Sequence, residues 1–193
     1  VAARSSQRNF GRGDVLIHQG DPGDGFFIIL AGVARVSMIA ANGREITLDF
    51  LEAGAMVGEI AVLDGQDRTA SVTAIEPVTA LRLERRAMRA ILDENPGFAW
   101  QLLGQMARRL RQANATIEGD RAFASGPRLA RSLIRLMASG PEGTHLRHDL
   151  NQTDLAHFAG MSREQINRQL SVWADCGIIR REQGRVRILE PET

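Results

Sequence analysis

Hydrophobic and polar residues alternate in short runs over the first half of the chain, from Asp14 to Leu83. Turns that contain glycine separate these runs. The Asn42-Gly43 pair lies between two of the runs, which is typical of a two-residue β-hairpin turn. Pro77 divides the last run into two strands. Several short strands at this spacing predict a compact β-sandwich or jelly roll.

From Arg85 onward the spacing of apolar residues becomes that of helices. A first helix is expected to stop before Pro96, and a longer one to run from about Gly97 to Phe123. Apolar residues of the longer helix recur at alternating gaps of four and three. The helix could pack on its own domain, but the narrow apolar strip with flanking charge favours a parallel coiled-coil dimer. The expected seam consists of Ala99, Leu103, Met106, Leu110, Ala113 and Ile117.

The last forty residues predict two helices joined by a tight turn. Ser162 and Gln165 match a capping box, so a helix is expected to start just after Ser162. Gly160 lies in the turn before it, where a positive φ costs little only for glycine. The segment 178–189 predicts a two-stranded hairpin. A short glycine turn between two helices, followed by such a hairpin, predicts a winged helix-turn-helix.

The second helix of this motif carries polar side chains on the side opposite Ile166 and Leu170. Arginine can bind guanine O6 and N7 together, and glutamate can accept a hydrogen bond from cytosine N4. The N-terminal end of such a helix meets base edges. The alternative is a solvated helix face with an acidic residue near the positive helix end. The residues expected to contact DNA are Ser162, Arg163, Glu164, Asn167 and Arg168.

The charge of the chain is unevenly distributed. Residues 1–98 hold ten arginines and thirteen acidic residues, whereas residues 121–193 hold eleven arginines and eight acidic residues. This difference indicates two modules with different partners. Together with Gly126-Pro127, which interrupts the long helix, it predicts three parts: 1–96, 97–124 and 125–193.

The composition is that of an ordinary globular protein, with 44% hydrophobic and 24% charged residues. No apolar run approaches the roughly 18 residues that a membrane span needs. Cys176 is the single cysteine, which excludes an internal disulfide and fits a reduced cytoplasm. We therefore expect a cytoplasmic protein with no membrane contact.

The stretch VGEIAVLDGQDRTASV, residues 57–72, contains two glycines, three acidic residues, one arginine and several small residues. Gly58 followed by a helix start can expose backbone N–H groups to an anion. Arg68 can grip phosphate as a fork, and Thr69 adds a hydroxyl. Glu59 repels phosphate but can accept a hydrogen bond from a sugar hydroxyl. The pattern predicts a site for a sugar phosphate or a cyclic nucleotide.

A simpler interpretation of this stretch remains open at this point. Arg68 could form a surface ion pair with Asp64 or Asp67, both of which are close to it in the sequence. An enzyme with Glu59 and Asp64 as a carboxylate pair is disfavoured, because no nucleophile, base or metal set converges on them. The four histidines do not form a convincing metal site, and we expect no bound metal.

Four segments of the chain resemble, in the same order, motifs of the cyclic-AMP receptor (CRP/FNR) family. They are LIHQGDPGD, GEIAVLDGQDRTAS, QMARRL and MSREQINRQL. The resemblance extends from about Phe10 to Leu189. It implies an α+β fold with an N-terminal jelly-roll β-roll of the cyclic-nucleotide-binding kind, a long dimerisation helix through 97–124, and a C-terminal winged helix-turn-helix.

The resemblance also implies roles for individual residues. Glu59 would bind the ribose 2′-hydroxyl, Arg68 and Thr69 the cyclic phosphate, and Gly58 the sugar through its backbone. Asn114 stands where cyclic-AMP receptors carry one of two residues that touch adenine, and it could hydrogen-bond a base. The implied effector is cyclic AMP (cAMP), with cyclic GMP, a cyclic dinucleotide or no effector as alternatives.

On the DNA side, Arg163, Glu164 and Arg168 match the family's base readers. The implied partner is double-stranded DNA with palindromic, TGTGA-like half-sites, bound by a homodimer. RNA polymerase is a further candidate partner. The function expected from the sequence is therefore that of a transcription regulator, not an enzyme, whose DNA affinity a cyclic nucleotide controls.

Overall fold

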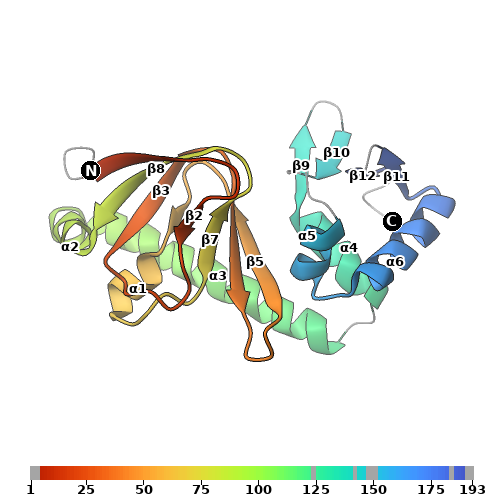
Figure 1. The fold of residues 1–193 in the computed structure, drawn as a ribbon, viewed down its shortest axis with the longest axis horizontal. Coiled ribbons are helices and arrows are strands. Elements are labelled where there is room, and N and C mark those ends of the chain that lie inside the picture. The colour runs from red at the N-terminus through yellow and green to blue at the C-terminus, as the bar shows by residue number, and fades with distance from the viewer. Residues whose placement is uncertain (1–4, 123–124, 141–142, 147–151, 183–184, 190–193) are drawn as a thin grey trace. The chain divides into compact units, whose positions relative to one another are not determined.

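The computed structural model describes residues 5–122, 125–140, 143–146, 152–182 and 185–189. The chain forms two compact units, Val1–Arg109 and Leu110–Thr193, and each is considered by itself (Figure 1). The boundaries at 96/97 and 124/125 expected from the sequence stay predictions. Within the described ranges, no helix is both long and apolar enough to cross a membrane.

In the described part of the first unit, eight antiparallel strands form a roll of two sheets. One sheet has the order β1-β8-β3-β6 and the other the order β2-β7-β4-β5. This arrangement confirms the expected β-roll. The strands are β1 (Ser5–Phe10), β2 (Val15–Ile17), β3 (Gly25–Ala31), β4 (Ala34–Ile39), β5 (Glu45–Leu51), β6 (Met56–Val57), β7 (Ser71–Ala74) and β8 (Val78–Glu84).

Strand β3 contributes to the apolar packing on both of its faces. Phe27 and Ile29 belong to the core between the two sheets. Phe26 belongs to a second core, which the helices cover. Because side chains alternate across a strand, a run without polar residues such as GFFIILA suits a strand that is buried on both sides.

The hairpin predicted at Asn42-Gly43 is present between β4 and β5. Gly43 has a φ of 78°, a conformation that glycine adopts without strain. The strands pair from Ile39 opposite Glu45 to Ala34 opposite Leu51. The two-residue signal therefore located this turn correctly.

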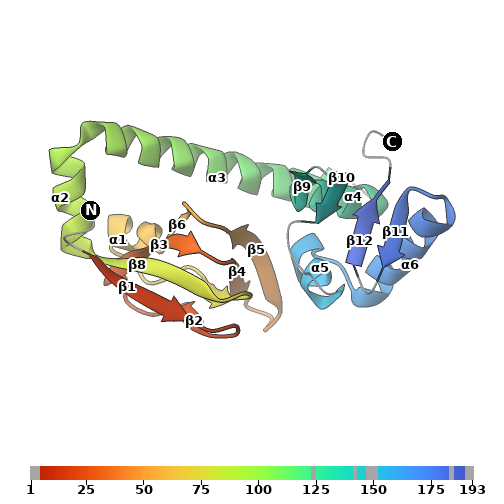
Figure 2. The ribbon, with the colours of Figure 1, turned by 90° about the horizontal axis from the view of Figure 1, so that it is seen from above.

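Helix α1 (Glu59–Asp64) lies between β6 and β7, and helices α2 (Arg85–Glu94) and α3 (Pro96–Ala122) follow β8. Helix α2 ends before Pro96, as predicted, and turns directly into α3 (Figure 2). Helix α3 begins in the first unit and ends in the second. It is the one element described here that belongs to both.

The apolar residues of α3 fall into a buried set and an exposed set. Leu102 and Met106 pack against the helix-covered core of the first unit. Met106, which belongs to the predicted seam, is therefore only partly exposed, and its place in a dimer seam stays a prediction. Other apolar side chains of the helix remain largely exposed, and they include Trp100, which the predicted seam omitted. These are Trp100, Leu103, Leu110 and Ile117, which expose 51–78% of their surface.

In its described residues, the second unit combines the end of α3 and three further helices with a four-stranded sheet of order β11-β12-β10-β9 (Figure 1). Strands β9 and β10 pair from Met137 opposite Leu146 to Gly140 opposite Gly143. His145 of β10 pairs with Arg187 of β12, which joins this hairpin to the wing. The elements are α4 (Ser125–Arg135), β9 (Met137–Gly140), β10 (Gly143–Leu146), α5 (Gln152–Ala159), α6 (Arg163–Asp175), β11 (Ile179–Glu182) and β12 (Arg185–Ile188).

Helices α5 and α6 form the predicted helix-turn-helix. The capping box is complete, because the Ser162 hydroxyl accepts from the Gln165 N–H and the Gln165 side chain accepts from the Ser162 N–H. Gly160 in the turn has a φ of 64°. Ile166 and Leu170 are buried, so the face of α6 that packs inward is the one predicted.

Candidate functional site

Glu59, the first residue of α1, is a fully buried carboxylate. Arg109 of α3 donates from Nη1 to Glu59 Oε1, and its Nη2 lies 2.8 Å from the Met56 carbonyl oxygen. The second carboxylate oxygen, Glu59 Oε2, is buried and accepts no hydrogen bond from any described residue. Because a buried acceptor without a donor is costly, this atom is suited to a hydroxyl or N–H of a ligand.

The electrostatics of Glu59 involve two arginines. Burial raises the pKa of Glu59 above its ordinary value of 4.5, and Arg109 and, more weakly, Arg68 partly offset this rise. Arg109 was not assigned a role from the sequence, although it lies in the QMARRL motif. Its partner is fifty residues away in the chain, so no local spacing could have identified the pair.

Arg68 is also buried, with 6% of its surface exposed. Its Nη1 donates to the Gly58 carbonyl at 2.6 Å, and its Nη2 donates to the Gly25 carbonyl at 2.6 Å. The Nη2 atom also lies 3.1 Å from Asp24 Oδ1. The alternative of a surface ion pair with Asp64 or Asp67 is therefore wrong. The ionic partner of Arg68 is Asp24, from the loop between β2 and β3.

The position of the Arg68 side chain leaves no room for a side chain at residue 58, which is a glycine. A Cβ at Gly58 would lie 2.9 Å from Arg68 Nη1 and 2.6 Å from Ile17 Cδ1, and the residue has a φ of 84°. Both the close approach and the backbone conformation favour glycine. Asp24, Gly58, Glu59, Arg68 and Arg109 together are called the Glu59–Arg68 cluster below.

Two other residues predicted to bind the ligand are exposed. Thr69 follows Arg68 directly and lies at the surface beside the cluster. Asn114 is exposed on the part of α3 that belongs to the second unit. It follows Trp100 by fourteen residues, so the two share one heptad position on the helix. Asn114 therefore lies on the same side of the helix as the exposed apolar strip.

Helix α6 presents most of the predicted DNA contacts to solvent. Arg163, Glu164 and Arg168 are exposed. Ser162 is exposed as well, but its hydroxyl is engaged in the capping box. Asn167 differs from expectation, since it is half-buried and its Oδ1 is buried without a hydrogen bond from the described residues. The position of Asn167 on the helix places it at the margin of the packed face.

Helix α4 holds the helix-turn-helix through two arginines that the sequence analysis did not single out. Arg128 Nη2 lies 3.2 Å from the Gly160 carbonyl oxygen in the turn. Arg135 Nη1 lies 3.1 Å from Thr116 Oγ1 of α3, and its guanidinium lies 4.9 Å from the centre of the Phe158 ring of α5. Arg135 thus connects the end of α3 to the first helix of the motif.

The wing adds positive charge near α6. Arg180 of β11 stands directly opposite Arg187 of β12, and both are exposed. Two exposed guanidinium groups on neighbouring strands are suited to contact with phosphate.

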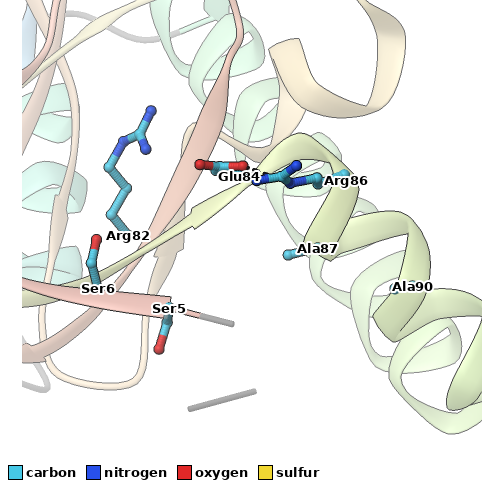
Figure 3. Close-up of a pocket in the computed structure, with 7 residues that line it drawn as sticks. All are labelled: Ser5, Ser6, Arg82, Glu84, Arg86, Ala87 and Ala90. Carbon is cyan, nitrogen blue, oxygen red and sulfur yellow. Dashed lines mark ion pairs between the residues drawn. The ribbon is translucent and has the colours of Figure 1, made fainter. Parts of the chain in front are cut away.

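A separate cavity of about 490 Å³ opens in the first unit, near the start of β1 and the end of β8 (Figure 3). Arg82 lies in its wall, and its guanidinium forms an Nη2–Oδ2 ion pair with Asp24 of the Glu59–Arg68 cluster. The lining residues are Ser5, Ser6, Arg82, Glu84, Arg86, Ala87 and Ala90. Among the residues with described positions, no group of three or more His, Cys, Asp or Glu side chains could hold a metal ion.

Comparison with known proteins assigns each half of the chain to a known domain family. Residues 7–95 match the family model of the cyclic nucleotide-binding domain, and residues 127–193 match that of the Crp-like helix-turn-helix domain. A CRP-like cAMP-activated global transcriptional regulator of Mycobacterium tuberculosis is 36% identical over 189 residues, which cover 95% of this chain and 84% of that protein. The cyclic AMP receptor protein of Thermus thermophilus is 31% identical, with the same coverage of both chains.

Solved structures agree with this assignment at the level of the fold. The c-di-GMP-responsive global regulator CLP of Xanthomonas campestris has a TM-score of 0.84 at 20% identity, with 97% of this chain and 95% of that chain covered. On the strength of the identity to its relatives over nearly the whole chain, this protein belongs to the CRP/FNR family of transcription regulators and carries that family's cyclic nucleotide-binding domain.

Proposed function

We propose that this regulator is a homodimer whose affinity for DNA is controlled by a cyclic nucleotide, with cAMP as the effector. One observation carries the proposal: a single buried cluster holds a carboxylate oxygen that lacks a hydrogen-bond donor, together with a guanidinium. Glu59 Oε2 lacks a hydrogen bond from the described residues, and Arg68 is electrostatically coupled to the same carboxylate.

The chemistry of a cyclic nucleotide suits this cluster. Its ribose 2′-hydroxyl can donate to Glu59 Oε2, and its phosphodiester carries the negative charge that a guanidinium attracts. Arg109 supports the first contact because it holds the other oxygen of the Glu59 carboxylate. Thr69, exposed beside Arg68, can donate its hydroxyl to a phosphate oxygen.

Homodimerisation is proposed through the exposed strip of α3. Trp100, Leu103, Leu110 and Ile117 lie at the spacing of a coiled-coil seam and are largely exposed. Asn114 lies in the same strip. A polar asparagine in such a seam specifies a single register between two helices, and in the proposed dimer it can also meet the nucleotide base.

DNA binding is proposed through α6 and the wing. Arg163 and Glu164, at the exposed N-terminal end of α6, would contact base edges, and Arg168 would contribute further along the helix. Arg180 and Arg187 would contact phosphates. A symmetric dimer implies a palindromic site, and the family resemblance supports TGTGA-like half-sites.

The effector must bind the DNA-competent state more tightly than the other state in order to control it. Helix α3 is the physical connection, because it carries Arg109 at the Glu59–Arg68 cluster and Thr116 beside Arg135. We infer that binding at Glu59 changes the position of this helix in the second unit and thereby the pair of α6 helices. The proposal places the protein in the cytoplasm, where DNA and cyclic nucleotides are both present.

A direct test is to titrate cAMP and cyclic GMP separately while measuring binding to a TGTGA-type palindrome. The expected result is that cAMP strengthens DNA binding at lower concentration than cyclic GMP does. Arg68→Lys keeps the buried positive charge but loses the fork, so it should lose most of the nucleotide response. DNA binding by Arg68→Lys in the absence of nucleotide should remain as in the wild type.

Cyclic di-GMP is a necessary third arm of the titration. DNA binding that responds to the dinucleotide alone would replace cAMP as the effector but keep the regulator. Unchanged nucleotide affinity in Arg68→Lys, measured by calorimetry, would contradict the assignment of the phosphate to Arg68.

A further inference from the structure

Asp24 is shared between two arginines that come from different parts of the β-roll. Its Oδ1 lies 3.1 Å from Arg68 Nη2, and its Oδ2 forms an ion pair with Arg82 Nη2. Asp24 itself is well exposed, with 67% of its side-chain surface accessible, whereas the Arg68 side chain is 5% exposed. The carboxylate therefore closes the Glu59–Arg68 cluster from the solvent side.

The backbone around Asp24 is held in place by close packing and by hydrogen bonds. A Cβ at Gly23 would lie 2.6 Å from the Ala61 carbonyl oxygen, which shows how closely this loop approaches α1. The Asp24 carbonyl accepts from the Arg85 N–H at 3.1 Å, and the Arg68 N–H donates to the Asp21 carbonyl at 2.9 Å. The loop and the segment that carries Arg68 are thus hydrogen-bonded to one another.

The hydrogen bonds of Arg68 leave no pair of parallel N–H groups for a phosphate. A guanidinium can present two such pairs, one from Nε with Nη2 and one from Nη1 with Nη2. Both pairs include Nη2, which already donates to the Gly25 carbonyl at 2.6 Å and to Asp24 at 3.1 Å. A bidentate grip on phosphate therefore requires one of these two acceptors to leave.

Asp24 is the acceptor that can leave. The Gly25 carbonyl belongs to the backbone of β3, and its hydrogen bond to Arg68 is short and buried. Asp24 contacts Arg68 through a flexible, solvent-exposed side chain at a longer distance. When it leaves Arg68, it still has the ion pair with Arg82.

We propose that Asp24 is a built-in competitor of the ligand phosphate for Arg68, and that Arg82 sets the strength of this competition by retaining the displaced carboxylate. This inference rests on the proposed function, since it concerns the affinity of the same cluster for a cyclic nucleotide. Asp24 and Arg82 are positioning residues, because they act through Arg68. Arg82 also lines the 490 Å³ cavity (Figure 3).

The test is a double-mutant cycle on the dissociation constant for cAMP, measured by calorimetry. Asp24→Asn keeps the shape but removes the competing charge, so it should bind cAMP roughly three-fold more tightly than the wild type. Arg82→Gln leaves the displaced carboxylate without a partner near the phosphate, so it should bind roughly three-fold more weakly. Adding Arg82→Gln to Asp24→Asn should change nothing further, because there is no longer a carboxylate to retain.

Arg86→Gln is the matched control. Arg86 lines the same cavity and carries the same charge, but its ion pair is with Glu84 and its side chain is 86% exposed. Arg86→Gln should leave the dissociation constant for cAMP unchanged. This result would show that the effect of Arg82→Gln comes from its ion pair with Asp24 and not from a general loss of positive charge. Thermal unfolding of each variant checks that the β-roll remains folded.

Several outcomes would overturn the inference. Weaker or unchanged binding by Asp24→Asn would mean that Asp24 only supports Arg68. An equal effect of Arg82→Gln with and without Asp24 would mean that Arg82 acts on the phosphate itself. If the wild type binds cAMP, each of these two results overturns only the inference about Asp24 and Arg82 and leaves the proposed function intact. The wild type could also bind no cyclic nucleotide. In that case, binding by Asp24→Asn would support competition between Asp24 and the phosphate. Absence of binding by both proteins would contradict both proposals.

Discussion

Arg109 of α3 and Glu59 of α1 form an ion pair in which the carboxylate has no exposed surface. The pair connects the helix that enters the second unit with the segment that carries the candidate ligand contacts. Arg109 also donates to the Met56 carbonyl, so its position is determined by two acceptors. A buried pair of this kind contributes little net stability when it is intact, but removal of one partner is costly.

Replacement of Arg109 by methionine should destabilise the first unit. The change leaves the Glu59 carboxylate buried without its partner, and we expect the free energy of unfolding at neutral pH to fall by about 3 kcal/mol. Urea denaturation measures this quantity. The double variant Arg109→Met/Glu59→Gln is the control, since it buries no charge and should lose less than Arg109→Met alone. An equal loss in both variants would contradict the electrostatic explanation.

The stability of the protein should carry a pH dependence that originates at Glu59. Burial raises the pKa of this carboxyl in the folded state above 4.5, so the folded state holds its proton more tightly than the unfolded state. The contribution of Glu59 to stability is therefore fully present below 4.5 and is lost as the pH rises through the raised pKa. Relative to Glu59→Gln, the wild type should become less stable over this range, as measured by urea denaturation at a series of pH values. A relative gain in stability with rising pH would show that the pKa is lowered instead.

A charge placed in the exposed strip of α3 should disrupt the proposed dimer. Leu110 exposes 63% of its surface on this strip, and Leu110→Glu would place two carboxylates in a symmetric seam. We expect sedimentation equilibrium to show a monomer at concentrations at which the wild type is a dimer. Ile39→Glu changes a similarly exposed apolar residue on β4 and should leave the oligomeric state unchanged. A wild type that is itself monomeric would refute the dimer.

Glu164 should influence which base is preferred at one position of each half-site. Truncation of its exposed side chain in Glu164→Ala removes an acceptor for cytosine N4, so discrimination at that position should fall by about 1–3 kcal/mol. Selection from randomised DNA measures the change. Asp175→Ala removes the same charge from the other end of α6 and should preserve the base preferences. Identical preferences in the wild type and in Glu164→Ala would exclude a base contact.

Features that depend on neighbouring residues were predicted correctly from the sequence. The hairpin at Asn42-Gly43, the end of α2 before Pro96 and the capping box of Ser162 and Gln165 are all present in the structure. Each is decided by backbone conformations or hydrogen bonds within about four residues. Local chemistry therefore determined these three features.

Local sequence rules do not determine which face of α3 packs inward, and they do not identify the partners of buried charges. Met106 and Leu103 are both apolar residues of one helix, and only the position of the neighbouring sheet decides that Met106 packs inward. Arg68 has acidic residues close by in the sequence, yet its ionic partner is Asp24, 44 residues away.

The sequence by itself thus determined the order of the elements, the β-roll and helix-turn-helix architecture and the residue types of both candidate sites. The tertiary structure alone decided that Arg109 holds Glu59 and that Asp24 occupies Arg68. The physical reason is that a buried charge must be neutralised by whichever opposite charge the fold brings within a few ångströms. That choice depends on the packing of distant segments, which no local pattern encodes.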